Sequence, residues 1–405
     1  MQIIAKFRPA AATYWLAALA LLLISQAGGA QAQTLPAVTI TPDGAPPETV
    51  FNWKTSRCND DQIPDSPARA FKTADGQVFL YATHYTNQPM NGDTLDNVKP
   101  GCRLGMPPKM NADPEMYDAK IWLQTFYTTD GNTIYSLGSS DYHGAWFDKC
   151  SVSKIENTKC WWSAIVLGIS TDRGRTFSTA SPPSHIIARS PHSYKTDQGS
   201  LAGFFTTSNI VKRDNFYYSL IFTQGFKEQK RGNCLMRTGA LSNPNSWRTW
   251  SGEGFATEFA PASVENVASP ERYACLPVKN LPEPVRSLVW HAPSKSYIAI
   301  FSSVRKLAAN EGRGVRVQFN YSTSSNLTEW AESKPLASFD SPPQCEKAIP
   351  PVGYPSLLDP QSTDINFGTV GSQGYIYFTQ YNAVKECRLN LNRDLMRMKV
   401  KIEPR

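Results

Sequence analysis

The feature that most constrains the fold of this chain is a hairpin pattern that recurs along it. In each instance, apolar and polar residues alternate on both sides of a short turn built from Asp-Gly, Asp-Asn or Ser and Gly. Period-two alternation around a tight turn is typical of antiparallel β-hairpins, and 3.6-residue helical periodicity is almost absent. The hairpins are predicted at residues 68–85, 120–140, 203–224, 285–304 and 365–382.

A second strand–turn–strand pattern follows most of these hairpins, at 165–178, 236–251, 317–332 and 387–402. All units but the first therefore contain four predicted strands, and the first lacks a clear second hairpin. The strand at 48–54 is expected to help close the ring. We predict an all-β chain, a five-bladed β-propeller of antiparallel four-stranded blades. A sandwich and a six-bladed propeller are the alternatives, and a sandwich would need more evenly spaced strands.

The N-terminus has the layout of an export signal. A basic start with Lys6 and Arg8 precedes an apolar stretch at 10–25 and a small-x-small cleavage site at 30–32. Residues 1–32 are therefore predicted to be a secretory signal peptide, with an N-terminal membrane anchor as the alternative. Residues 33–50 are predicted to be a linker or N-terminal arm and 51–405 the propeller domain. The mature protein is expected in the periplasm or outside the cell, with no membrane attachment after cleavage.

The cysteines agree with export. The chain has 8 of them, and an even count in an oxidising compartment indicates disulfides. The sequence leaves the connectivity open, and pairing of sequence neighbours is the interpretation preferred here. No CxxC motif occurs and no His lies at ligand spacing from a Cys pair, so no metal and no other cofactor is predicted. The preferred pairs are Cys58–Cys102, Cys150–Cys160, Cys234–Cys275 and Cys345–Cys387.

Charge and motifs exclude several classes of function. The net charge of +7 is modest and dispersed, with no run of five like charges, so nucleic acid is not an expected partner. Neither a G-x-S-x-G elbow nor a phosphate-binding loop occurs, which leaves serine-hydrolase and nucleotide-hydrolase mechanisms unsupported. The protein is expected to be a monomer.

Short turn motifs carry a family resemblance. Residues 170–177 (STDRGRTF) match the Asp-box of sialidases, a turn in which an Asp caps backbone N–H groups and a Gly takes a positive φ. Residues 322–330 (STSSNLTEW) resemble turns of glycoside hydrolase families 43 and 32, and 354–359 (YPSLLD) resemble an inner-strand start in the same group. The opening of the first hairpin resembles their first blade. The resemblance, over residues 65–402, implies a five-bladed glycosidase-like propeller.

The sequence also departs from these families. Family 43 enzymes place a Glu general acid on an inner strand of the third blade, and here residues 203–211 contain no carboxylate. Sialidases use three arginines with a Tyr/Glu pair, whereas only Arg69 and Arg286 can be nominated. The resemblance therefore implies the architecture more strongly than it implies either activity.

Candidate site residues are those at the starts of inner strands, because inner strands converge on the central channel. Glycoside hydrolysis needs one protonated and one ionised carboxyl group across the scissile bond. Each carboxylate could equally be a turn cap. The candidates on this ground are Asp65, Arg69, Glu115, Asp118, Glu283, Arg286, Tyr354, Ser356 and Asp359.

A second cluster lies at 139–150, where Asp141, His143 and Trp146 follow one another closely. A carboxylate, an imidazole and a flat indole suit a sugar, although Trp146 could be core and His143 could bind a loop carbonyl. His84 could line the channel too, but a buried structural histidine is the preferred interpretation.

The predicted partner is a glycan or oligosaccharide. In the enzymatic hypothesis Asp65 is the base and Asp141 or Glu283 the acid. The alternatives are a non-catalytic propeller that binds a glycan or an envelope protein, and a scaffold without a sugar site. The substrate contacts are predicted to be Arg69, Asp118, His143, Trp146, Arg286, Tyr354 and Asp359.

Overall fold

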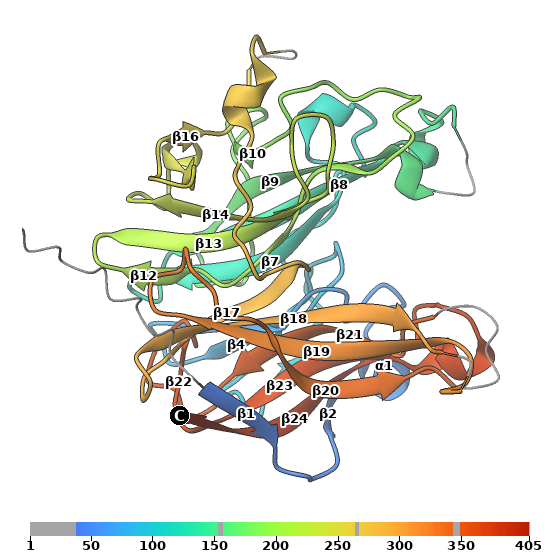
Figure 1. Ribbon diagram of the computed structural model, residues 1–405, viewed down its shortest axis with the longest axis vertical. Coiled ribbons are helices and arrows are strands. Elements are labelled where there is room, and N and C mark those ends of the chain that lie inside the picture. The colour runs from blue at the N-terminus through green and yellow to red at the C-terminus, as the bar shows by residue number, and fades with distance from the viewer. Residues whose placement is uncertain (1–37, 153–156, 264–266, 309, 343–348, 405) are drawn as a thin grey trace, which may run out of the picture. The chain divides into compact units, whose positions relative to one another are not determined.

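The computed structural model describes residues 38–404, except for 153–156, 264–266, 309 and 343–348. Residues 35–405 form one compact unit, and the predicted signal peptide lies outside the described residues. Strands dominate this unit, which confirms the predicted all-β class (Figure 1). Its described helices are α1 (Trp53–Ser56), η1 (Pro114–Met116), η2 (Gly144–Phe147), η3 (Asn157–Cys160), η4 (Pro244–Ser246), η5 (Pro270–Tyr273) and η6 (Asn382–Glu386).

The first sheet has the order β3-β4-β5-β6 and is fully antiparallel. No clear second hairpin was predicted for this unit, but β5 and β6 form one. β5 and β6 are only three and two residues long, which is too short to show an alternating pattern. Its strands are β3 (Arg69–Lys72), β4 (Val78–Tyr81), β5 (Met90–Gly92) and β6 (Lys99–Pro100).

The next two antiparallel groups share one sheet, because β9 and β11 pair in parallel over Ala202↔Trp162 and Gly203↔Ser163. Gly203 makes this approach possible: its φ is +106°, and a Cβ there would lie 1.8 Å from the carbonyl oxygen of Ser163. The first group is β7 (Ile121–Thr128), β8 (Ile134–His143), β9 (Trp161–Ser170) and β10 (Ile186–Ala188). The second is β11 (Ala202–Thr207), β12 (Val211–Arg213), β13 (Phe216–Thr223), β14 (Gly232–Thr238), β15 (Arg248–Thr249) and β16 (Thr257–Glu258).

The last two sheets contain the C-terminal third of the chain and the N-terminal strands. A hairpin was predicted at 365–382, but its first strand does not pair with its second. β22 leaves this sheet and pairs in parallel with β17, while β23 pairs with β21. One sheet is β17 (Val285–His291), β18 (Ser296–Lys306), β19 (Val315–Ser324), β20 (Lys334–Asp340) and β22 (Thr369–Val370). The other is β21 (Val352–Leu358), β23 (Gln373–Tyr381), β24 (Arg393–Pro404), β1 (Val38–Pro42) and β2 (Glu48–Phe51).

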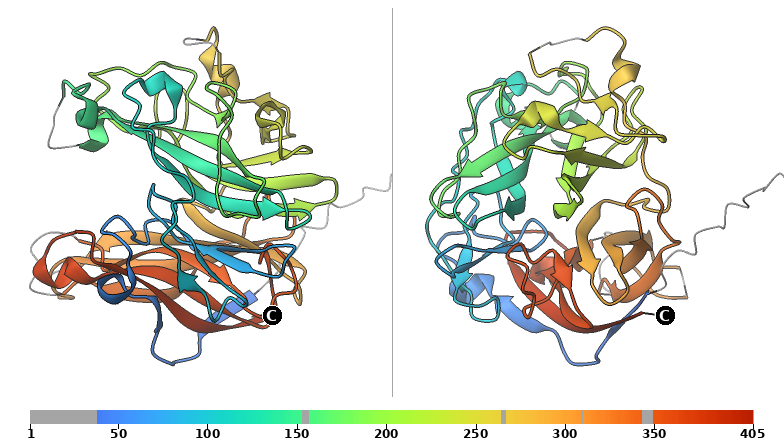
Figure 2. Two further views of the ribbon diagram at one scale, coloured as in Figure 1. Left: turned by 180° about the vertical axis from the view of Figure 1, so that it is seen from behind. Right: turned by 90° about the vertical axis from the view of Figure 1, so that its left-hand side faces the viewer.

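The innermost strands form a closed ring. β3 contacts β7, β7 contacts β11, β11 contacts β17, β17 contacts β21, and β21 contacts β3 again. Each is the first strand of an antiparallel group, as expected for blades arranged around a channel. Figure 2 shows the groups from two further sides. The arrangement is that of a β-propeller, and the count of five blades stays a prediction that this ring supports.

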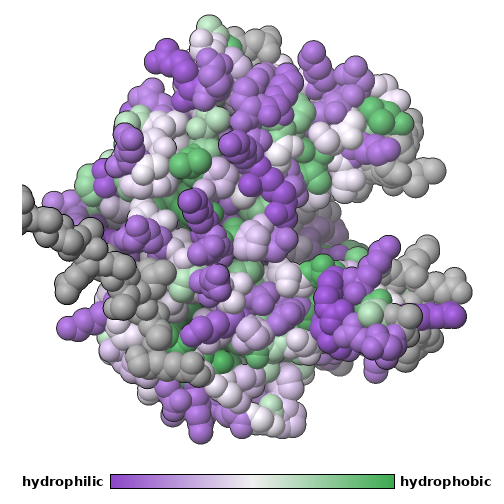
Figure 3. Space-filling model, viewed as in Figure 1, coloured by the Kyte–Doolittle hydropathy of each residue, from purple (hydrophilic) through white to green (hydrophobic). Residues whose placement is uncertain are grey.

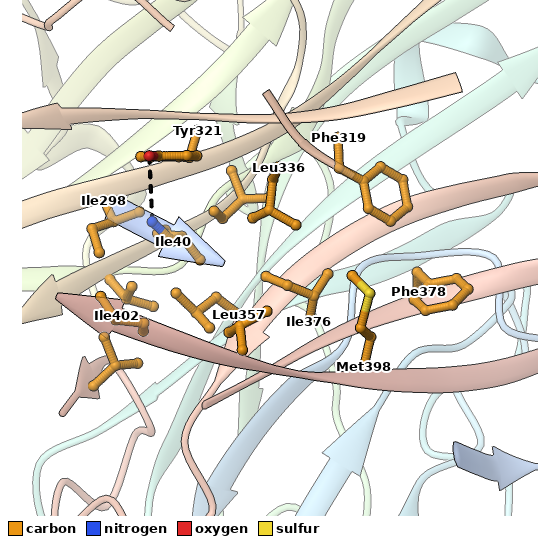
Figure 4. Packing of buried hydrophobic residues seen from close by; sticks show 14 of the residues in the cluster. Ile40, Ile298, Phe319, Tyr321, Leu336, Leu357, Ile376, Phe378, Met398 and Ile402 are labelled. Atoms are coloured by element: carbon orange, nitrogen blue, oxygen red, sulfur yellow. Dashed lines mark hydrogen bonds between the residues drawn. The ribbon is translucent and has the colours of Figure 1, made fainter. Parts of the chain in front are cut away.

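The N-terminal segment helps to close the ring, as expected. β1 and β2 both pair with β24, so the two ends of the described chain share one sheet. The Tyr321 hydroxyl fastens β1 to the preceding sheet: it accepts from the backbone N–H of Ile40 (3.3 Å) and contacts the carbonyl of Val38 (3.2 Å). Figure 4 shows the hydrogen bond between Ile40 and Tyr321 beside a core of buried aliphatic and aromatic side chains from both sheets. The expected arm at 33–50 therefore includes a paired strand.

Three disulfides lie at or near the ends of strands, and one of their cysteines, Cys234, belongs to β14 itself. Cys58–Cys102, Cys150–Cys160 and Cys234–Cys275 are bonded, as predicted. The fourth predicted pair includes Cys345, which lies outside the described residues. No helix among the residues that the structure describes is long and apolar enough to cross a membrane.

Candidate active site at the channel mouth

Asp65 lies at the centre of a polar cluster at one end of the ring, which we call the channel mouth. Its Oδ1 accepts a hydrogen bond from the Tyr354 hydroxyl (3.2 Å) and forms an ion pair with the Arg393 guanidinium. Its Oδ2 accepts from the Trp122 indole N–H (3.4 Å) and lies 3.8 Å from Nε2 of His84. These partners come from β21, β24, β7 and the segment after β4, so four segments converge on one carboxylate. The side chain is 17% exposed and remains in reach of a ligand.

The local sequence fixes Asp65 in this position. It stands between Pro64 and Ser66-Pro67, directly before β3, and proline restricts the backbone on both sides. The Thr379 hydroxyl on β23 donates to the carbonyl of Pro64 (3.1 Å), which ties this loop to the last sheet. The carboxylate therefore stands on a constrained segment at the start of an inner strand, as the sequence predicted.

Asp141, near the end of β8, occupies a different environment. Its side chain is buried, with the residue 7% exposed, and Oδ1 accepts from the hydroxyls of Ser139 (2.6 Å) and Ser163 (2.7 Å). Burial raises the pKa of Asp141 to about 6; the two hydroxyls oppose this shift, and the negative charge of Asp65 adds to it. Asp141 therefore holds a proton to a higher pH than an exposed carboxyl group and feels the charge of Asp65.

An aromatic wall surrounds the buried amine of Lys120. Nζ of Lys120 lies 3.5 Å from the ring centroid of Trp146 and 4.1 Å from that of Tyr85. His143 stacks on Trp146 at 4.1 Å between centroids and packs against Trp161 at 4.4 Å. Burial lowers the pKa of Lys120 to about 8. Trp146 is 44% exposed, so part of an indole is open to solvent beside the two carboxylates.

Arginines and tyrosines line the opposite side of the mouth. Nη1 of Arg286 donates to the Thr206 hydroxyl (2.6 Å), and the guanidinium carbon lies 5.0 Å from the Tyr354 ring centroid. The guanidinium of Arg393 lies 5.2 Å from the ring of Tyr381. Burial lowers the pKa of Arg286, and the tyrosines and Asp65 oppose that shift. This side of the mouth therefore combines donors with aromatic faces.

Arg69 lies deeper than the other candidates and is 2% exposed. Its guanidinium donates to the hydroxyl of Ser356 (2.8 Å) and to the backbone carbonyls of Ala68 (3.0 Å), Thr207 (3.3 Å) and Arg286. These acceptors lie on or beside β3, β21, β11 and β17. Arg69 was predicted to contact the substrate, but its hydrogen bonds connect the inner strands to one another.

Four further carboxylates have other local partners. Glu283 is ion-paired with Arg231 (2.6 Å), although it is near enough to Arg286 to interact electrostatically. Asp118 forms an ion pair with Lys109 (3.1 Å). Asp359 accepts hydrogen bonds from the backbone N–H groups of Gln361 (2.9 Å) and Gly371 (3.0 Å). Glu115 accepts one from the backbone N–H of Tyr194 (3.0 Å). The structure therefore brings together Asp65, Asp141, His143, Trp146, Arg286 and Tyr354, and sets Asp118, Asp359 and Glu115 apart.

Sequence reasoning missed Arg393, Lys120 and Trp122. Lys120 and Trp122 flank the start of a predicted strand, and a lysine next to an apolar run was an available signal. Arg393 begins the third strand of its sheet, and no sequence pattern shows that such a start reaches the channel. His84 is buried, which lowers its pKa to about 4 and keeps the ring neutral near pH 7.

The surface is hollowed at the edge where these segments end. In the space-filling view a notch separates the ends of β8 and β9 from those of β18 and β21 (Figures 1 and 3). Among the described residues, no group of three or more His, Cys, Asp or Glu side chains could hold a metal ion.

No family model and no curated protein matches this chain. Solved structures similar to it include an α-L-arabinanase from Cellvibrio cellulosa complexed with arabinohexaose, with 13% identity, a TM-score of 0.46, and coverage of 84% of this chain and 92% of that one. An α-L-arabinofuranosidase from Fusarium graminearum has 10% identity, a TM-score of 0.47 and coverage of 88% and 96%. A GH32 β-fructofuranosidase from Bombyx mori has 12% identity, a TM-score of 0.44 and coverage of 84% and 62%.

By their descriptions these three structures are glycoside-cleaving enzymes. Identities of 10–13% with TM-scores of 0.44–0.47 are too low to transfer an activity or the role of any residue. The function has to be argued from the side chains of this chain.

Proposed function

We propose that this chain is an exported glycoside hydrolase with Asp141 as general acid and Asp65 as general base. The observation that carries the proposal is the contrast between the two carboxylates. Asp65 is ion-paired with Arg393, whereas burial raises the pKa of Asp141 to about 6. One carboxyl group that keeps its proton to a higher pH, beside a second one that is ion-paired, is what acid–base cleavage of a glycosidic bond requires.

In the proposed reaction Asp141 gives its proton to the oxygen of the departing sugar as the glycosidic bond breaks. Asp65 takes a proton from the water that attacks the anomeric carbon, so the two carboxyl groups exchange protonation states. Trp146 is 44% exposed and offers the accessible part of its indole as an apolar contact for the sugar, since His143 and Lys120 already contact the ring. Arg286 and Tyr354 supply donors that fix the hydroxyl groups of the substrate.

Export is supported by the disulfides. The chain has three disulfides among its described residues. Disulfides persist in oxidising compartments and are rare in the reducing cytosol. With the predicted signal peptide, they support a mature enzyme in the periplasm or outside the cell, and we propose that it acts as a monomer.

The direct test is release of reducing ends from a panel of plant, fungal and bacterial glycans by wild type, Asp65→Asn and Asp141→Asn. Each variant should lower kcat by about 10²–10⁴-fold, the usual contribution of a general acid or base. Glu283→Gln is the matched control, since Glu283 was the other candidate acid and is paired with Arg231. Circular dichroism and melting temperature should show that every variant is folded. Wild-type turnover by Asp65→Asn would exclude the mechanism.

A non-catalytic glycan-binding protein is the second candidate. The contrast in exposure between Trp146 and Asp141 favours it, because a binding contact needs only access, whereas proton transfer requires Asp141 itself to reach the substrate. Glycan binding by wild type without release of any product, combined with weaker binding by Trp146→Ala, would establish this alternative.

A further inference from the structure

The channel mouth holds more positive than negative charge. Asp65 forms its ion pair with Arg393. Within the described ranges, neither Arg286 nor Lys120 forms an ion pair with a carboxylate, and Arg69, directly beneath, donates only to a hydroxyl and to carbonyls. Burying a charge without a counter-charge is costly. A ligand that brings negative charge would remove part of that cost.

Arg286 has side-chain N–H donors that no described residue uses. Of its side-chain nitrogens only Nη1 has a hydrogen-bond partner among the described residues, the Thr206 hydroxyl (2.6 Å). Nε and Nη2 have no such partner, and neither atom is fully buried, so solvent or a ligand can reach them. These two nitrogens form the edge of a guanidinium that matches a carboxylate or sulfate with two parallel hydrogen bonds.

The charges around Arg286 explain why a protein carboxylate does not already satisfy it. The nearby Asp65 is ion-paired with Arg393, and Glu283 is ion-paired with Arg231. Arg69 and Arg286 repel each other, since the charge of Arg286 together with burial lowers the pKa of Arg69 to about 9. The arginine pair therefore has an unmet preference for an anion on the solvent side.

Lys120 adds a second positive group on the facing wall. Its ammonium lies against the rings of Trp146 and Tyr85 and has no hydrogen-bond acceptor within the part of the chain that the structure describes. An ammonium flanked by aromatic faces is held in place yet keeps N–H donors for a ligand. A charged sugar that contacts the exposed part of Trp146 would bring an anionic group close to this amine.

We propose that the site selects acidic glycans, in which a carboxylate or a sulfate ester of one sugar pairs with Nε and Nη2 of Arg286 and Lys120 attracts an anionic group of another sugar in the same glycan. This inference rests on the proposed function for the placing of the sugar, and it adds the chemical class of the substrate. A neutral glycan would leave both cations unpaired, whereas an acidic one pairs them while Asp65 and Asp141 stay available.

The test is calorimetric binding to Asp141→Asn, which should be unable to turn substrate over and keeps the Asp65–Arg393 pair. The probes are oligogalacturonides and alginate oligosaccharides, the same oligosaccharides after reduction of their carboxyl groups, and sulfated galactan oligosaccharides with their desulfated forms. At least one acidic probe should bind about tenfold or more tightly than its neutral counterpart, and its affinity should fall as salt rises.

The matched variants are Arg286→Gln and Arg305→Gln, each in the Asp141→Asn background. Arg305 is exposed and forms an ion pair with Glu311 in the β18–β19 hairpin, so its substitution removes the same positive charge away from the channel mouth. Arg286→Gln should remove most of the acidic preference and Arg305→Gln should not. The carboxylate and sulfate arms identify which anion is recognised. Equal binding of acidic and neutral probes, or no binding of any acidic probe, would overturn the inference.

Turnover separates this inference from the proposed function. If wild type cleaves neutral glycans but neither binds nor cleaves acidic ones, the protein is a hydrolase of neutral glycans. In that case the proposed function holds and only the preference for acidic glycans fails. Selective binding of acidic probes without product release leaves the inference standing and makes the protein an acidic-glycan binder.

Discussion

Arg69 illustrates how the surroundings of a residue decide its role. Its position before an inner strand is what a substrate-binding arginine would have, yet its hydrogen bonds go to Ser356 and to carbonyls on neighbouring inner strands. A single guanidinium thus satisfies acceptors from several segments of the ring, a geometry that lysine could not reproduce.

We expect Arg69→Leu to destabilise the fold. Leucine keeps much of the volume but leaves the carbonyls of Ala68, Thr207 and Arg286 without this donor, and each buried acceptor that loses its partner costs about 1–3 kcal/mol. Urea denaturation should show a free energy of unfolding lower by about 3 kcal/mol or more. Unchanged stability with lost glycan binding would instead restore the substrate-contact role predicted from the sequence.

Asp141 should make stability depend on pH. Its pKa is about 6 in the folded protein and near 3.8 when exposed, so between these values the folded chain binds more protons than the unfolded chain. The free energy of unfolding should therefore fall as pH rises from about 4 to about 6, by about 3 kcal/mol from this group. Unfolding curves of wild type and Asp141→Asn across this range measure the difference. A slope that persists unchanged in the variant would contradict the shifted pKa.

The sequence could nominate some site residues and not others. Asp65 and Asp141 stand beside constrained or polar segments, and the structure brings them to one mouth. Asp359 has the same kind of position in sequence, but its carboxylate caps backbone N–H groups of a turn. A capping and a catalytic carboxylate look identical in one sequence, because only their tertiary neighbours differ.

At the scale of elements, local turn chemistry was predictable. In residues 170–177, Ser170 Oγ accepts from the N–H of Gly174 (2.7 Å) and Asp172 Oδ1 from that of Thr176 (2.9 Å). The turn at Ser324 repeats this with Asn326, whose Oδ1 accepts from the N–H of Glu329 (2.9 Å). Strand exchange was not predictable: β22 joins β17 across a sheet boundary through contacts that no local pattern encodes.

The attachment of β1 can be tested at one hydroxyl. Tyr321→Phe removes the contacts to Ile40 and Val38 while the ring remains in the core, so it should lower the free energy of unfolding by about 1–2 kcal/mol. Tyr297→Phe is the control, since Tyr297 is also buried and its hydroxyl has no hydrogen-bond partner among the described residues. Thermal or urea unfolding of both variants measures the effect. Equal stability of the two would show that the pairing with β24 and the packing hold β1 without help from this hydroxyl.

At the scale of the whole molecule, the ring depends on joining distant parts of the chain. Strand patterns indicated blades, but the pairing of β1 with β24 joins Val38 to Pro404 and has no local signal. Forming such a contact carries the loop-closure entropy of almost the whole chain. Covalent links that shorten the free loops of the unfolded chain should therefore matter to this fold.

The disulfides should stabilise the molecule in the order of the loops they close. Cys58–Cys102 spans 44 residues and Cys150–Cys160 spans 10. The chain-entropy relation gives about 4 kcal/mol for the longer loop and about 3 kcal/mol for the shorter one. Replacing both cysteines of one pair by serine should therefore lower stability more at 58 and 102 than at 150 and 160, measured by urea unfolding of the oxidised proteins. The reverse order would mean that the short link, next to Trp161 and the aromatic wall, acts mainly by holding the folded channel mouth.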